Sequence, residues 1–242
     1  MATVSRWSKL RTVSSWPVGV AVVTWRYMWR TTPLHRSEET GDESDLAGLA
    51  EEALRPGDGR QPVSEGVGPL LHRCYWADVV ATQMTPEQLI DSIANQLNQV
   101  SPEMATFRKT RGTGGGVRQG EEFVVRMPGP WDGPVRVARR DATSFQLVTL
   151  QGHLEAGQIE FRAARAGADA LRFEIESWAR AGDRLSALMY NKLGLAKEIQ
   201  LNMWTHFCIR SATLAHGRLR GGVSIRTRWV QWPEDRKPPA GP

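Results

Sequence analysis

The spacing of apolar residues changes period along the chain. Between residues 122 and 176, apolar and polar side chains alternate, which is the pattern of half-buried strands. The turns between these stretches are short, so we expect neighbouring strands to pair antiparallel. Five strands are predicted, with apolar positions at Phe123–Met127, Val135–Val137, Phe145–Leu147, Ile159–Ala163 and Leu171–Ile175.

Helical spacing flanks this block on both sides. Thr85-Pro86-Glu87-Gln88 is a typical helix start, with Thr as the cap, Pro at the first position and Gln three residues after the cap. Apolar residues follow at helical spacing as far as Val100. A second helix is predicted from Asp183 to His216, with Gly217 as its stop. Such a helix would be roughly 50 Å long.

The order of these elements predicts the fold class. Leu70–Val80, Met104–Lys109 and Val223–Trp232 add further candidate strands. A curved antiparallel sheet with one apolar face needs a cover, and a long amphipathic helix supplies it. We therefore predict an α+β helix-grip fold, in which a sheet of about six to seven strands wraps around a long C-terminal helix.

A helix lying in a curved sheet either leaves an internal apolar cavity or packs against side chains that fill the space. Alternation alone does not distinguish a cavity wall from a filled core. If there is a cavity, its predicted ligand-binding residues are Phe123, Val125, Trp131, Phe145, Leu147, Ile159, Phe161, Phe173, Ile175, Ile199, Met203 and Phe207.

The net charge of +5 is unevenly distributed. Residues 1–36 carry +6 and no acidic residue, residues 37–60 carry −6, residues 61–216 carry +1 and residues 217–242 carry +4. The basic character therefore belongs to the ends of the chain. A nucleic-acid-binding body should carry its own basic stripe, so we do not expect a nucleic-acid partner.

Composition divides the chain into four predicted parts. Residues 1–36 form a basic, Trp-rich segment, and residues 37–67 are predicted to be an acidic flexible linker with few large apolar side chains. The helix-grip domain is expected over residues 68–217, followed by a basic, Pro-rich tail over residues 218–242.

Residues 1–36 allow two interpretations. The longest uncharged stretch, Thr12–Trp25, has 14 residues, whereas a membrane-spanning helix needs about 20. The segment could lie at an anionic membrane surface, with arginines at headgroups and tryptophans at the boundary. Alternatively, it folds back onto its own domain. With two cysteines and no glycosylation sequon, we expect a cytoplasmic protein, which is membrane-peripheral if residues 1–36 bind the membrane surface.

Two loops offer candidate chemistry. His153 follows Gly152 in a strand-to-strand loop, where it could act as an acid or base with Glu155, or simply fix the turn. Glu160 should point away from the interior. The Pro-rich loop around Trp131 could be a lid over a cavity or a rigid hairpin. No metal-ligand spacing or dinucleotide motif occurs, so no metal and no cofactor are expected.

One segment resembles a known family. Thr149–Phe161 reads Thr-Leu-Gln-Gly-His-Leu-Glu-Ala-Gly-Gln-Ile-Glu-Phe. It is similar to the Thr-Leu-x-Gly-His-Pro-x-x-Gly-Glu-Glu-x-Phe segment of the family called domain of unknown function nineteen-ninety. Strand Phe173–Ser177 and Arg180 also fit, and the resemblance covers about Val67–Gly217. Leu154 and Gln158 depart from the family pattern. At fold level, the family resembles the START, birch-allergen and polyketide-cyclase superfamily of hydrophobic-ligand binders.

Three functions are consistent with the sequence. The first is a non-enzymatic binder of a hydrophobic small molecule held between the sheet and the C-terminal helix. The second is an enzyme of cyclase or hydrolase type that uses His153 as acid or base. The third is a peripheral membrane adaptor that acts through residues 1–36.

Overall fold

The computed structural model describes residues 32–54, 57–103, 105–127, 132–183 and 195–232. Within them, nine strands form one sheet in the order β1-β9-β2-β8-β7-β6-β5-β4-β3. β1 pairs with β9 in parallel, and every other neighbouring pair is antiparallel. The strands are β1 (Leu34–Thr40), β2 (Val67–Val80), β3 (Thr106–Arg111), β4 (Glu122–Arg126), β5 (Asp132–Arg140), β6 (Ser144–Thr149), β7 (Glu155–Arg165), β8 (Ala170–Ala181) and β9 (Arg218–Val230).

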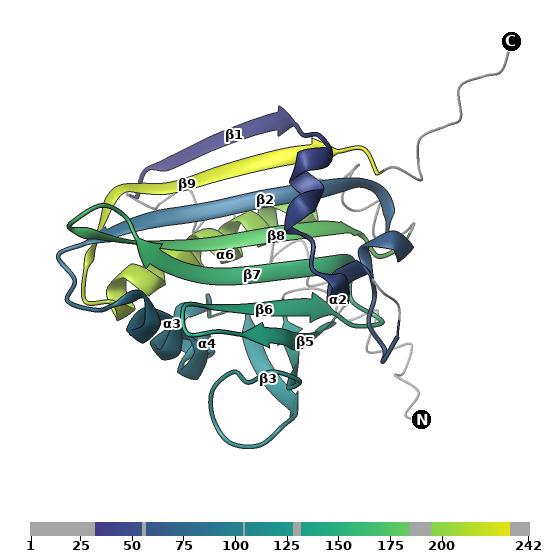
Figure 1. Cartoon of the computed structure of the whole chain (residues 1–242), viewed down its shortest axis with the longest axis horizontal. Helices are drawn as coiled ribbons and strands as arrows, with labels where there is room; N and C mark the ends of the chain where they lie inside the picture. Colours follow the sequence, from purple (N-terminus) through teal and green to yellow (C-terminus); the bar gives the residue numbers. More distant parts are fainter. Residues whose placement is uncertain (1–31, 55–56, 104, 128–131, 184–194, 233–242) are drawn as a thin grey trace, which may run out of the picture.

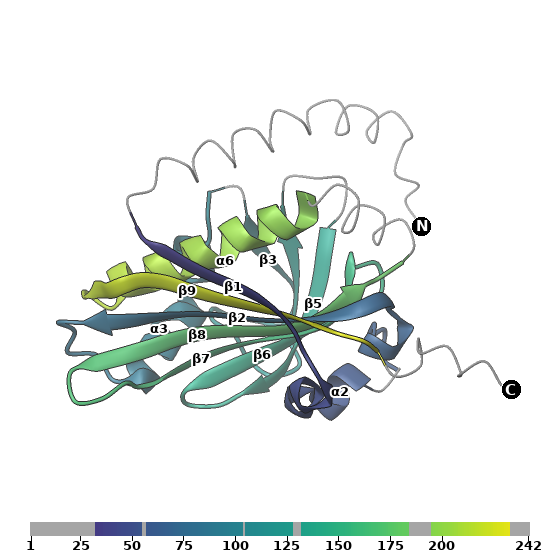
Figure 2. The same ribbon diagram turned by 90° about the horizontal axis from the view of Figure 1, so that it is seen from above.

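Helix α6 (Leu195–Leu214) lies along the concave face of this curved, unclosed sheet (Figures 1 and 2). The arrangement is the predicted helix-grip fold, with more strands than expected. The predicted helical residues 184–194 lie outside the described part of the chain. His216 takes a left-handed conformation after the helix, and the Gly217 N–H donates to the Ala212 carbonyl, so the helix ends close to the predicted stop.

The main core lies between the sheet and α6. Apolar residues at matched register form a continuous row across five strands, because Phe145, Phe161, Ile175, Tyr75 and Ile225 are successive cross-strand partners. All five side chains are buried. The alternation in the sequence therefore identified the inward face of β6, β7 and β8 correctly.

The helix predicted from Thr85 is present as α3 (Pro86–Asn95) and the short α4 (Leu97–Val100). The Thr85 hydroxyl accepts from the Gln88 N–H, and the Gln88 side chain accepts from the Thr85 N–H, which is the predicted capping box. α3 packs against β7 and α6, and its apolar residues Leu89, Ile90 and Ile93 join the main core.

Residues 37–67 do not form the expected linker. They contain most of β1, the 3₁₀ helices η1 (Glu43–Gly48) and η2 (Val63–Glu65), and the short helix α2 (Glu51–Leu54). Figure 2 shows this segment on the side of the sheet opposite α6. A second apolar cluster forms there, from Ala53, Val63, Leu70, Ala138, Val148, Trp178, Val230 and Trp232. The linker prediction was wrong because the few apolar residues of this segment can fold by packing against an apolar patch that the sheet already presents.

The predicted basic tail is also partly incorporated. Residues 218–230 form β9, which lies between β1 and β2, and residues 233–242 lie outside the described part. Residues 1–31 are likewise not described, so the predictions for the Trp-rich segment stay predictions. None of the described helices is long and apolar enough to cross a membrane.

Candidate functional site

A pocket opens between the concave face of the sheet and α6. Apolar residues from β3, β4, β5, β6 and α6 form most of its wall, and polar residues from β6, β7, β8, α6 and the loop before β7 also line it. It is lined by Phe107, Val125, Met127, Val135, Leu147, Thr149, His153, Glu155, Gln158, Ile159, Ser177, Ala179, Gln200, Met203 and Trp204.

The pocket is small. Its free space is about 60 Å³, compared with roughly 300–1,000 Å³ for ligand pockets of drug-sized molecules. The middle of the gap between sheet and helix is filled by aromatic rings. Phe161 lies 4.6 Å from Phe145, 5.2 Å from Phe207 and 5.5 Å from Trp204, measured between ring centroids.

The described residues among the predicted ligand-binding set therefore separate into two groups, those that line the pocket and those that do not. Val125, Leu147, Ile159 and Met203 line the pocket. Trp131 and the side chain of Ile199 are outside what the structure describes. The others are buried core residues that do not line this pocket, namely Phe123, Phe145, Phe161, Phe173, Ile175 and Phe207.

His153 and Glu155, the two predicted candidates for chemistry, both line this pocket. His153 lies in the loop before β7. Its Nδ1 lies 2.9 Å from the Glu155 N–H and 3.1 Å from the Glu155 carbonyl oxygen. Because the N–H can only donate, the shorter contact favours an accepting Nδ1. A neutral imidazole with an accepting Nδ1 carries its proton on Nε2. Burial lowers the pKa of His153 to about 4, against a partial opposing effect of the Glu155 backbone, so the ring is neutral at pH 7.

Glu155 begins β7, and its carboxylate is part of a buried polar chain. Gln200 Nε2 on α6 donates to Glu155 Oε2 at 2.5 Å, and Arg73 Nη1 on β2 donates to Gln200 Oε1 at 2.7 Å. Burial raises the pKa of Glu155, while the charge of Arg73 and the bond from Gln200 act against this rise. The pKa of the Glu155 carboxyl group is thus raised, and the cationic Arg73 nearby limits the rise.

Glu160 is excluded from the pocket, as predicted. It lies on the outer face of β7, where Arg139 Nη2 donates to its Oε1 at 2.9 Å. Arg73, Gln200, Ser177 and Trp204 were missed by sequence reasoning. Gln200, Met203, Trp204 and Phe207 share one side of a helix by their spacing, so helical periodicity could have revealed Gln200 and Trp204.

Comparison with known proteins shows the family to which the chain belongs. The family model described as "Domain of unknown function (DUF1990)" matches residues 80–208, which is more than half of the chain. The chain belongs to the DUF1990 family. The resemblance seen in Thr149–Phe161 is therefore confirmed. No curated protein matches the chain.

Solved structures resemble the DUF1990 protein at low sequence identity. Norcoclaurine synthase from Thalictrum flavum has a TM-score of 0.46 and 13% identity, covering 69% of this chain and 99% of that chain. A hypothetical protein from Helicobacter pylori has a TM-score of 0.45 and 7% identity, covering 69% and 98%. Ara h 8.0201 has a TM-score of 0.41 and 8% identity, covering 60% and 99%.

The DUF1990 family match includes all the residues that line the pocket. His153, Glu155, Gln200 and Met203 lie within residues 80–208, whereas Arg73 on β2 lies before them. The hydrogen bonds from Arg73 to Gln200 and from Gln200 to Glu155 therefore join a residue outside the matched part to two residues inside it.

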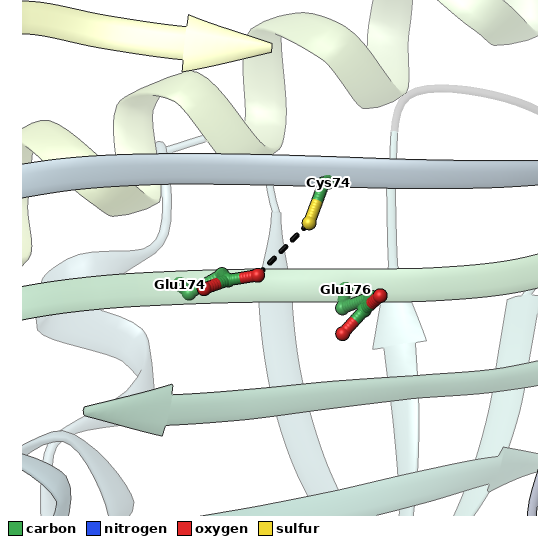
Figure 3. A group of neighbouring side chains, drawn as sticks. All are labelled: Cys74, Glu174 and Glu176. Atoms are coloured by element: carbon green, nitrogen blue, oxygen red, sulfur yellow. Dashed lines mark hydrogen bonds between the residues drawn. The ribbon is translucent and has the colours of Figure 1, made fainter. Parts of the chain in front are cut away.

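A second polar cluster of the DUF1990 protein lies on the outer face of the sheet. Cys74, Glu174 and Glu176 place possible metal-ligand atoms within 4.8 Å of one another (Figure 3). Cys74 Sγ donates to Glu174 Oε1, and burial together with the nearby carboxylates raises the pKa of this thiol. Arg162 bonds both carboxylates at 2.6 Å. A guanidinium already supplies the cation here, and the thiol stays protonated.

His72 extends this outer cluster toward η1. Its Nδ1 lies 2.7 Å from Asp45 Oδ1, and its Nε2 lies 2.7 Å from Glu176 Oε1. The ring also stacks on Trp178 at 4.8 Å between centroids, and Trp178 Nε1 donates to the Asp45 carbonyl. These contacts hold η1 against the sheet, so we assign the cluster a structural role.

Proposed function

We propose that this protein binds a small, largely apolar molecule in the pocket between the sheet and α6. The supporting observation is the composition of the pocket, which is lined mainly by apolar residues and also by a few polar ones, among them His153, Glu155 and Gln200. Such a site gives an apolar ligand a defined orientation. The limited space favours a slender ligand. Met127 and Met203 in the wall have flexible side chains that can adjust to it.

Binding is tested with a fluorescent fatty-acid probe, together with native mass spectrometry of freshly purified protein to detect a retained molecule. Val125→Phe adds a ring to the pocket wall, whereas Val124→Phe alters the adjacent residue on the opposite face of β4. We expect saturable one-to-one binding by the natural protein and by Val124→Phe, and binding at least about tenfold weaker by Val125→Phe.

Thermal unfolding and circular dichroism would establish that both variants are folded. Equal affinity of folded Val125→Phe and the natural protein would contradict the proposed location. Absence of any saturable binding or retained molecule would contradict the proposal itself.

A second candidate function is an enzyme of cyclase or hydrolase type acting in the same pocket. It is favoured by one observation, since His153 and Glu155 both line the pocket. A neutral His153 with an accepting Nδ1 is suited to donating from Nε2 rather than to removing a proton. Turnover that depends on either residue would distinguish this candidate from passive binding.

A further inference from the structure

Two polar residues that line the pocket have complementary chemistry. The Glu155 carboxyl group can accept or release a proton, and His153 carries an N–H on Nε2 because its Nδ1 is occupied by the Glu155 N–H. One residue is a proton acceptor and the other a hydrogen-bond donor within one small space.

The surroundings of Glu155 favour proton transfer over a purely structural role. The bond from Gln200 fixes Oε2, and Gln200 is itself oriented by Arg73. Apolar walls from Val125, Leu147 and Met203 lower the local polarity, and burial raises the pKa of Glu155. A carboxyl group shifted in this way is better matched to proton transfer near neutral pH.

His153 is held by its backbone contacts. The Glu155 N–H, at 2.9 Å from Nδ1, favours the tautomer with its proton on Nε2 over the one in which Nδ1 donates to the Glu155 carbonyl at 3.1 Å. The position that a Cβ on Gly133 would occupy lies 3.0 Å from Nε2. Because position 133 is glycine, β5 approaches the imidazole closely. A hydrogen-bond donor and a carboxyl group that line the same pocket are the two groups that formation of an enolate from a carbonyl compound requires.

We propose that the pocket accepts a carbonyl compound and moves a proton at the carbon next to the carbonyl, with Glu155 as the base and His153 Nε2–H bonded to the carbonyl oxygen. This inference rests on the proposed binding site. The C–H bond breaks as the proton forms an O–H bond with Glu155, and the electron pair moves toward the carbonyl oxygen. Return of a proton from Glu155 to carbon restores the carboxylate, so no other reactant is required.

The test uses linear methyl ketones from 2-butanone to 2-octanone in D₂O. Saturation-transfer NMR measures binding, and loss of the proton signals next to the carbonyl measures exchange with deuterium. We expect the natural protein to bind and exchange at least one ketone. Glu155→Gln should bind it but exchange on the order of 100-fold more slowly. Glu160→Gln, on the opposite face of the same strand, should behave like the natural protein.

Three further measurements test whether exchange takes place in the pocket and depends on the acid at position 155. The pocket-filling Val125→Phe should abolish exchange, and Glu155→Asp, which keeps the acid, should retain more exchange than Glu155→Gln. In the natural protein the exchange rate should rise with pH through a midpoint above the ordinary pKa of 4.5, because only the ionised carboxylate removes the proton.

Ketone binding without exchange, or undiminished exchange in folded Glu155→Gln, would overturn this inference and leave the binding proposal intact. Binding of the fatty-acid probe without binding of any ketone would also overturn it. If neither the probe nor any ketone binds, and no retained molecule is found, both proposals fail.

Discussion

His153 and Glu155 lie two positions apart in the chain, and burial in the same pocket shifts their pKa values in opposite directions. The pKa of His153 falls to about 4 and that of Glu155 rises, since burial disfavours the charged form of each. Both residues are therefore less charged at neutral pH than they would be in water. The pocket can admit an apolar molecule without leaving two exposed charges against it.

The titration of His153 predicts a dependence of stability on pH. Between pH 6.5 and about 4, the unfolded chain binds a proton at this position that the folded protein does not bind, so the free energy of unfolding falls as pH falls through this window. His153→Asn removes the titration, and its side-chain oxygen can still accept from the Glu155 N–H. Relative to the natural protein, we expect the variant to gain about 3 kcal/mol of unfolding free energy between pH 7 and pH 4.

Urea unfolding at a series of pH values measures this difference. His35→Asn provides the matched control, because His35 lies exposed on β1 at the edge of the sheet. Parallel stability curves for the natural protein and His153→Asn would show that His153 is not buried as a neutral ring.

The segment from η1 to η2 acts as a cover for the outer face of the sheet. Gln158 on β7 donates to the Gly48 carbonyl and accepts from the Ala50 N–H, and Trp178 packs beneath Gly48. These contacts join residues more than 100 positions apart in the sequence. They also give Gln158 a structural role at the position where the family pattern has Glu.

Gly48 is the sensitive point of this cover. A Cβ at Gly48 would lie 2.1 Å from the Trp178 ring, so Gly48→Ala must displace the ring or the segment. We expect a loss of about 1–3 kcal/mol in the free energy of unfolding and earlier proteolysis within residues 41–66. Gly115→Ala is the control, since a Cβ added at that position would meet no atom within 4 Å.

Chemical denaturation and limited proteolysis of both variants provide the measurement. If Gly48→Ala were as stable as the natural protein, the close packing between η1 and β8 would be wrong.

Prediction from sequence succeeded where one element carries its own pattern. The strands from β4 to β8 show alternation, and α3 shows a capping box, so both were predicted. β1 was missed because its Ser37, Glu38 and Glu39 carry no alternation and it lies at the edge of the sheet. η1 was missed because its burial depends on Trp178 and Gln158, which are distant in sequence.

In the site, too, the features with a local sequence pattern were predicted, whereas those that depend on residues distant in sequence were not. Alternation placed Val125, Leu147 and Ile159 on the inward face, and the loop pattern singled out His153. Sequence could not show that stacked rings such as Phe145 and Phe161 fill the middle of the gap, because filling depends on how side chains from several elements meet.

At the scale of the whole molecule, the uneven charge leaves two interpretations of the N-terminal segment, of which one is that it binds anionic membranes. Replacing Arg6, Lys9 and Arg11 by Gln in the full chain removes three of the six basic residues within residues 1–36. Each basic residue near an anionic surface contributes about 1 kcal/mol. We expect binding to vesicles containing phosphatidylserine to fall on the order of 100-fold.

Sedimentation with phosphatidylserine vesicles and with neutral phosphatidylcholine vesicles measures the effect. Replacing Arg236 and Lys237 by Gln tests whether bases at the other end act equally. Unchanged sedimentation after the N-terminal substitutions would remove the membrane interpretation and favour a segment that folds back on its own domain.

The parallel pairing of β1 with β9 has a consequence for synthesis of the protein. Leu34 is the register partner of Val223, so β1 cannot pair with β9 until the chain has been synthesised beyond Val223. Closing so long a loop is slow, and the central part of the sheet can assemble beforehand. During that interval the backbone groups of β1 stay unpaired, so this segment can pair wrongly with other strands until β9 has been made.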